Sequence, residues 1–94
     1  MKYASVVTVD ELYKLALEKE GRDVAELRIK LLEKDFRILP VDKELAKVSA
    51  EMRSGYRIPM ADSVIAATAK FHGLRCITDD PHLTQIKEIK TGWI

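Results

Sequence analysis

Oxygen-bearing side chains follow the short apolar runs of this sequence that we interpret as β-strands. They are Thr8, Asp10, Glu11, Asp42, Thr78, Asp79 and Asp80. In an open parallel sheet, sites form outside the carboxyl ends of the strands, so these side chains are the ones to consider first. Convergent carboxylates repel one another unless a cation neutralises them, and such hard oxygen ligands suit Mg²⁺ or Mn²⁺. The sequence therefore predicts a metal site built from two or three carboxylates.

Asp62 is a further candidate and lies in a different setting. It stands near the start of residues 60–72, MADSVIAATAKFH, a run that is apolar nearly all round and therefore predicts a buried helix. A carboxylate that enters such a helix is less easily explained as solvated surface than the other acids. We expect it to face the same edge of the sheet as the acids that follow the strands.

Each acid also has a purely structural interpretation. Glu11 stands three residues after Thr8, in the spacing of a helix capping box. Asp42 and Asp80 are good N-cap residues, and Asp62 in a first helical turn complements the helix dipole. The pattern alone leaves both interpretations open.

Other reactive residue types give weaker signals. His72 lies at a helix end and His82 in the first turn of an exposed helix, and we expect neither to be a ligand or a catalytic group. The single cysteine, Cys76, excludes an internal disulfide and a cysteine-rich zinc site. Arg53, Arg57 and Lys70 could contact phosphates. We favour the interpretation that these three form a solvated face.

The composition excludes several classes of protein. Ninety-four residues with 47% hydrophobic and 33% charged side chains indicate one domain that buries a modest core. Sixteen basic and 15 acidic residues leave a formal charge of +1, so any nucleic-acid contact must be local. No apolar run approaches the roughly 18 residues of a membrane span. The apolar stretch at the start of the sequence is too short for the apolar region of a secretory signal. We expect no membrane partner and a cytoplasmic location.

Strands and helices alternate along the chain. We expect strands at 3–7, 36–41, 74–78 and 91–94; a helix from the capping box at Thr8 to Gly21; and helices at 22–35, from Asp42 to just before Gly55, at 60–72, and from Pro81. Such alternation with short connections predicts an α/β fold, with helices on the faces of a parallel sheet.

Three motifs in this order closely resemble the PIN domain. They are SVVTVDEL at 5–12, PMADSVIAATA at 59–69 and GLRCITDD at 73–80, and the middle one is the most specific. The resemblance covers essentially the whole chain. It is strongest to the small VapC-type toxins, which are metal-dependent endoribonucleases.

The resemblance implies roles for particular residues. Glu11, Asp62 and Asp80 match three family acids that hold Mg²⁺ or Mn²⁺, Thr78 helps to orient the site, and Asp79 occupies a variable position. It also implies that a metal-activated water attacks an RNA phosphodiester in line. The expected partners are an RNA substrate and an antitoxin protein, and the expected fold is a three-layer parallel sheet flanked by helices. Thr8 is then a helix cap.

The resemblance also has one departure. The family's first strand, which ends in an aspartate, and its first two helices have no counterpart before Tyr3. We therefore expect residues 1–94 to form a single PIN-like domain that is incomplete at the N-terminus, lacks the central strand of the sheet and has weak or no activity. Buried unpaired strand edges are costly, so we expect a homodimer or larger homo-oligomer.

Two alternatives to a nuclease stay open. A non-catalytic remnant would serve as an oligomerisation or antitoxin-binding module. A phosphoacceptor receiver domain shares the acidic strand ends, but it needs a lysine after a late strand, and Lys87 and Lys90 fall inside or after a helix.

Overall fold

The chain folds into two compact units, Met1–Pro40 and Val41–Ile94. The computed structural model describes residues 2–78 and 80–92. Each unit contains helices and one pair of parallel strands, which confirms the predicted α/β class. Among the described residues, no helix is both long enough and apolar enough to cross a membrane.

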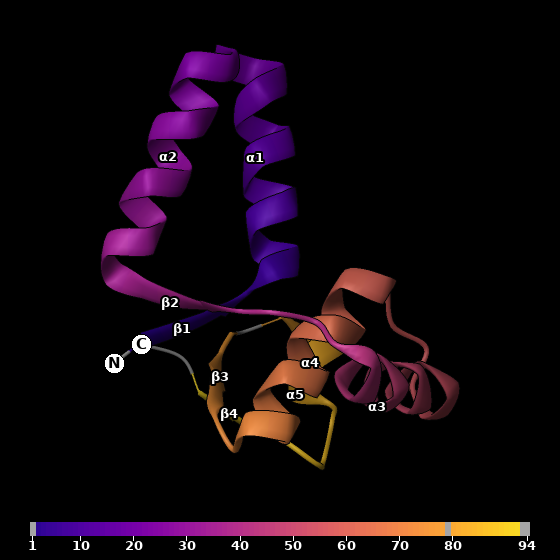
Figure 1. The fold of residues 1–94 in the computed structure, drawn as a ribbon. Helices are drawn as coiled ribbons and strands as arrows, with labels where there is room; N and C mark the ends of the chain where they lie inside the picture. Colours follow the sequence, from indigo (N-terminus) through magenta and orange to yellow (C-terminus); the bar gives the residue numbers. More distant parts are fainter. Residues whose placement is uncertain (1, 79, 93–94) are drawn as a thin grey trace. The chain divides into compact units, whose positions relative to one another are not determined.

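In the first unit, a hairpin of two helices connects two parallel strands that pair with each other. Its elements are β1 (Lys2–Ser5), α1 (Val6–Glu20), α2 (Arg22–Asp35) and β2 (Phe36–Leu39). The strands pair in register from Lys2 opposite Phe36 to Ser5 opposite Leu39. Figure 1 shows α1 and α2 side by side, connected by a tight turn.

Gly21 makes this turn possible. It has a φ of +91°, which a residue with a Cβ atom rarely adopts, and its amide donates to the carbonyls of Ala16 and Leu17. Ala16 and Ala25 are buried, so small side chains let the two helices approach closely. The predicted end of the first helix at Gly21 is therefore confirmed, and so is the predicted span 22–35 of the second helix.

The predicted start of the first helix is wrong. The helix begins at Val6 rather than after Thr8, because the hydroxyl of Ser5 accepts a hydrogen bond from the amide of Val7 at 3.2 Å. Ser5 therefore caps the helix three residues earlier than expected, and β1 ends at Ser5 instead of Val7. Thr8 is not a cap, and Glu11 lies in the second turn of α1 rather than at the third position of a capping box.

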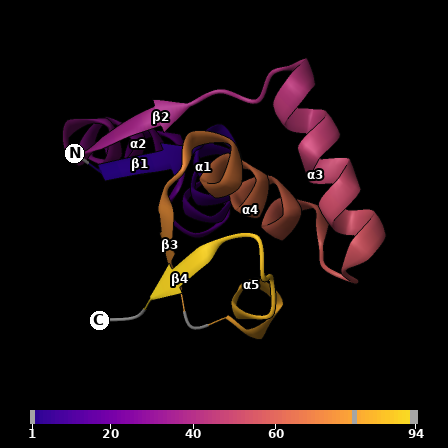
Figure 2. The ribbon, with the colours of Figure 1, turned by 90° about the horizontal axis from the view of Figure 1, so that it is seen from below.

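The second unit is built around a buried helix. Its elements are α3 (Lys43–Gly55), α4 (Met60–His72), β3 (Arg75–Ile77), α5 (Pro81–Thr84) and β4 (Lys90–Gly92). Strands β3 and β4 pair in parallel, from Arg75 opposite Lys90 to Ile77 opposite Gly92, and Figure 2 shows α5 in the connection between them. The predicted helix at 60–72 is confirmed, and so is its end at Gly73, which has a φ of +64°.

The core of this unit lies between α3, α4 and the segment around α5. Buried apolar side chains fill it: Leu45, Met52, Ile58, Val64, Ala66, Ala67, Ala69, Leu83 and Ile86. Where α3 packs on α4, two buried hydroxyl groups meet: Ser49 Oγ lies 2.9 Å from Ser63 Oγ, and the Ser63 hydroxyl donates to the carbonyl of Met60 at 2.6 Å. This pairing satisfies both hydroxyls and fixes the first turn of α4.

The four described strands form two separate two-stranded sheets, β1 with β2 and β3 with β4. Parallel pairing is as predicted, whereas three layers around one sheet stay a prediction. The last strand begins at Lys90, and residues 93–94 of its predicted span lie outside the described part of the chain.

The serine pair yields a stability prediction. Ser63→Ala leaves the buried Ser49 hydroxyl without its partner and should lower the free energy of unfolding by about 1–3 kcal/mol. Ser49→Ala should cost less, because Ser63 keeps its bond to Met60. Urea unfolding followed by circular dichroism measures both, and equal costs would contradict this account.

Candidate metal centre

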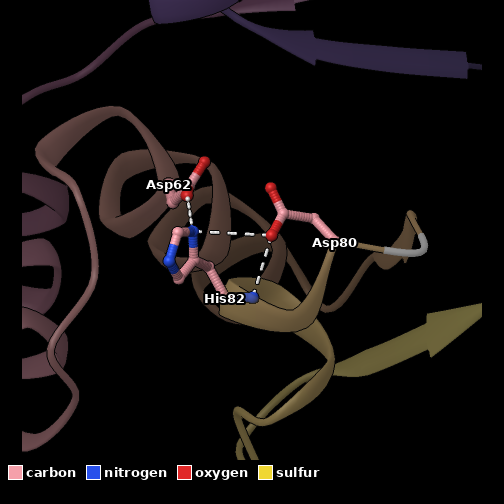
Figure 3. A group of neighbouring side chains, drawn as sticks. All are labelled: Asp62, Asp80 and His82. Carbon is pink, nitrogen blue, oxygen red and sulfur yellow. Dashed lines mark hydrogen bonds and ion pairs between the residues drawn. The ribbon is translucent and has the colours of Figure 1, made fainter.

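Three side chains of the second unit converge on one point. Asp62 comes from the first turn of α4, and Asp80 and His82 come from the start of α5. The Nδ1 atom of His82 lies 3.2 Å from Oδ2 of Asp62 and 3.5 Å from Oδ1 of Asp80, distances of ion pairs when the imidazole is protonated. Figure 3 shows the imidazole ring directed toward both carboxylates. The structure thus brings together two of the predicted acids and one residue that was not expected.

Asp62 is the least exposed member of this cluster. Its side chain is 18% exposed, compared with 42% for Asp80 and 50% for His82. The burial follows from the sequence of α4, because the next residue, Ser63, is fully buried and anchors the turn against α3. Most of the Asp62 side chain is therefore shielded from water.

Asp80 is fixed by its role as a helix cap. Its Oδ1 accepts a hydrogen bond from the amide of His82 at 2.9 Å, and Pro81 occupies the first turn of α5. The Thr78 hydroxyl accepts from the amide of Asp80 at 3.0 Å, and the Thr78 amide donates to the carbonyl of Gly92. Thr78 thereby connects Asp80 to the paired strands β3 and β4. The predicted N-cap is confirmed, and the same residue also lies in the acidic cluster.

The sequence did not indicate that His82 belongs to this cluster. It is exposed in the first turn of a short helix, as expected, yet its imidazole faces the two acids. The available signal was its position two residues after an N-cap aspartate, which brings its amide to the Asp80 carboxylate and its ring close to it. Its contact with Asp62 depends on the packing of α5 against α4, which no local pattern predicts.

Two predicted site residues are not in the cluster. Glu11 is exposed on α1 in the first unit. Asp79, predicted to support the site, lies outside the described residues. Their roles stay predictions.

The cluster offers donor atoms that a divalent cation can bind. Its three ligand atoms all lie within 4.8 Å of one another. Metal–ligand bonds of about 2.1 Å place neighbouring donor atoms about 3 Å apart in an octahedral site, close to the two Nδ1–oxygen distances. Carboxylates suit Mg²⁺ and Mn²⁺, while an imidazole nitrogen favours Mn²⁺ or a later transition metal. The residues therefore fit a divalent metal ion.

Cys76 on β3 does not supply a thiolate to this centre. Burial raises the pKa of its thiol, and the negative charge of Asp62 raises that pKa further. The thiol is therefore harder to deprotonate than that of an ordinary cysteine, and Cys76 is not among the three residues whose ligand atoms converge.

The sequence was also compared with families and individual proteins. A family model described as the PIN domain matches residues 1–89. The chain belongs to the PIN domain family. Ribonuclease VapC4 of Mycobacterium tuberculosis is 31% identical over 93 residues, covering 92% of this chain and 72% of that protein. Toxin FitB of Neisseria gonorrhoeae is 38% identical over 89 residues, covering 83% of this chain and 64% of that protein.

Solved structures show the same relationship in three dimensions. The FitAcB structure from Neisseria gonorrhoeae matches this PIN chain with a TM-score of 0.75 and 32% identity, covering 96% of this chain and 73% of that one. A DNA-bound VapBC from Salmonella typhimurium matches with a TM-score of 0.82 and 19% identity, over 95% and 72% of the two chains, and supports the fold alone. The predicted PIN resemblance and its VapC-type relatives are therefore confirmed.

The raised pKa of the thiol makes a chemical prediction for this PIN domain. Alkylation of Cys76 by iodoacetamide should be slow at pH 8, with a midpoint above that of an ordinary cysteine. Asp62→Asn removes the second cause of the shift and should lower the midpoint, whereas Glu51→Gln, which changes an exposed carboxylate on α3, should not. Rates measured by mass spectrometry from pH 7 to 10 would contradict the assignment if both variants matched the unmodified protein.

Proposed function

We propose that this chain is a VapC-type, metal-dependent endoribonuclease that cleaves RNA phosphodiesters. The observation that carries the proposal is the convergence of Asp62 and Asp80 beside His82, in a chain that belongs to the PIN family. Both aspartates are among the acids that the sequence predicts for the site, and each lies in a motif that resembles the PIN domain. The names of the matched relatives, a ribonuclease and a toxin, support the same activity.

In this proposal each side chain has a separate task. Asp62 and Asp80 hold a Mg²⁺ or Mn²⁺ ion, with Asp62 as the rigid member and Asp80 held by the α5 cap. Thr78 positions Asp80 through its backbone amide. His82 directs its imidazole toward both acids, and the ring would limit their mutual repulsion when it carries a proton. Glu11 contributes the third acid.

A bound divalent ion would supply Lewis-acid chemistry, lowering the pKa of a water molecule and offsetting negative charge on the scissile phosphate. The protein residues make this chemistry possible by keeping two carboxylates close together. Without a cation these acids repel both each other and a phosphodiester. RNA approach and metal binding are therefore coupled at the centre.

We also propose a regulatory partner, an antitoxin protein. The match to a structure described as a toxin–antitoxin complex from Klebsiella pneumoniae, with a TM-score of 0.75 and 25% identity, supports this role. A structure from Mycobacterium tuberculosis described as a member of the VapBC family of toxin–antitoxin systems, with a TM-score of 0.74 and 29% identity, supports it as well.

The activity is tested with a mixed-sequence single-stranded RNA, in Mn²⁺, in Mg²⁺ and in a chelator. Cleavage should require metal, and Asp62→Asn should lower its rate by at least about 100-fold, because one ligand charge is lost. Glu11→Gln should lower the rate too. Glu51→Gln is the matched control, since it neutralises an exposed carboxylate of α3 and should leave cleavage unchanged.

Metal binding is measured separately by thermal unfolding. A metal that binds only the folded state must raise the unfolding temperature, and Asp62→Asn should abolish that rise. A metal-dependent rise without RNA cleavage would favour the non-catalytic module. The proposed centre would be refuted if neither the chelator nor Asp62→Asn lowered the rate of RNA cleavage.

Self-association is the second part of the proposal. In the first unit, Leu15, Leu27 and Leu31 are each about half exposed, and Leu27 and Leu31 lie one turn apart on α2. Each two-stranded sheet also leaves its outer strand edges unpaired among the described residues. Exposed apolar side chains and free strand edges both favour association with a second copy. A three-layer arrangement around one sheet is part of this proposal.

Light scattering after size exclusion tests the assembly. At micromolar concentration the protein should be a homodimer or larger, and Leu27→Gln combined with Leu31→Gln should shift it toward the monomer. Glu33→Gln changes another exposed position of α2 and should have no effect. A folded monomer across this concentration range would rule out the assembly.

A further inference from the structure

A shallow groove of about 730 Å³ lies beside the proposed metal centre in the second unit. It runs along the last turn of α3 and residues 57–59 of the loop that leads to α4, and His82 of α5 closes one side. It is an open depression and not an enclosed pocket, so it suits a ligand that lies along the surface.

Two arginines give the groove a positive charge. Arg53 and Arg57 both line it and are exposed to solvent. Among residues 2–78 and 80–92, neither guanidinium forms an ion pair with a carboxylate. Helix α4 begins after Pro59, also in the groove, and no side chain caps its first amide groups. These groups together favour an anion.

His82 connects the groove to the acidic cluster. It lines the groove, and its Nδ1 lies 3.2 Å from the Asp62 carboxylate. An anionic chain that follows the two arginines is therefore led to the carboxylates that hold the proposed metal. Lys70, the third basic residue considered from the sequence, does not line this groove.

The other lining groups indicate what kind of contact the groove makes. They include Ser54, the buried Ile58 and Pro59, and none of the described side chains that line the groove is a phenylalanine, tyrosine or tryptophan. The imidazole of His82 is the aromatic ring among these lining residues, and its Nδ1 faces the acidic cluster. The main charged groups of the groove are guanidiniums, which bind phosphates regardless of the base.

We propose that Arg53 and Arg57 bind the phosphate backbone of single-stranded RNA next to the scissile bond, with little base preference. This inference rests on the proposed ribonuclease function and adds to it the residues that hold the substrate. It replaces our sequence-based interpretation of the two arginines as a solvated face.

The test measures RNA binding without cleavage. Fluorescence anisotropy with labelled 12-nucleotide oligo-U and oligo-A gives the affinity of the full chain. It is measured in Mn²⁺ at times too short for cleavage, and again in chelator, where the uncompensated acids should weaken binding equally in every variant. Arg53→Gln combined with Arg57→Gln should weaken binding by at least about tenfold and reduce the slope of log affinity against log salt by about 1.4, that is about 0.7 per lost phosphate contact. Both oligonucleotides should bind within about threefold of each other.

Lys43→Gln combined with Lys47→Gln is the matched control. It removes the same charge from exposed positions of α3, the helix that carries Arg53, outside the groove, and should change RNA affinity by less than about twofold. Equal losses in the two double variants would overturn the proposal in favour of diffuse charge. So would an unchanged affinity in the arginine variant, the absence of RNA binding by the unmodified chain, or tighter binding of a polyglutamate peptide than of RNA.

The two proposals fail in different ways. If the arginine variant binds RNA normally while metal-dependent cleavage persists, the groove assignment fails and the nuclease stands. If the arginine variant loses RNA binding but no form of the chain cleaves RNA, the groove stands and the nuclease fails. In either case the arginine variant should keep the Mn²⁺-dependent rise in unfolding temperature.

Discussion

Two carboxylates held close together are the constraint on which the second unit depends. Asp62 and Asp80 both face one imidazole nitrogen, and like charges at such separations are unfavourable without a positive partner. The fold supports the arrangement from two sides. The buried serine pair fixes the first turn of α4, and the cap of α5 together with Thr78 fixes Asp80. A local electrostatic cost is thus offset by packing and hydrogen bonds at some distance from the charges.

Much of the fold follows from local signals in the sequence. The predicted ends of α1 and α4 are confirmed because the glycines that follow them, Gly21 and Gly73, have a positive φ and stop the helices. The start of α1 was mispredicted because Ser5 and Thr8 offer competing hydroxyl caps, and the choice depends on where β1 stops pairing with β2. The pairing of strands into two small sheets is likewise a long-range property that periodicity does not encode.

The site was predictable to a similar extent. Asp62 and Asp80 stand out because a carboxylate at the start of an apolar helix, and one before a proline, each carry a local physical meaning. His82 and the groove arginines carry none by themselves. Their surroundings are set by how α3, α4 and α5 pack, which brings Arg57 and His82 together across 25 positions of sequence. A single sequence does not reveal residues whose role depends on neighbours that tertiary packing brings close.

The cap of α5 has a consequence for local order. One oxygen of Asp80, Oδ1, both accepts the amide bond that starts the helix and faces the imidazole of His82. A helix of only four residues has too few internal bonds to persist without such support. An ion bound at the proposed centre would compete for, or reinforce, the atom that starts this helix. Formation of α5 and binding of that ion would then be thermodynamically linked, and the backbone of α5 would respond to the state of the site.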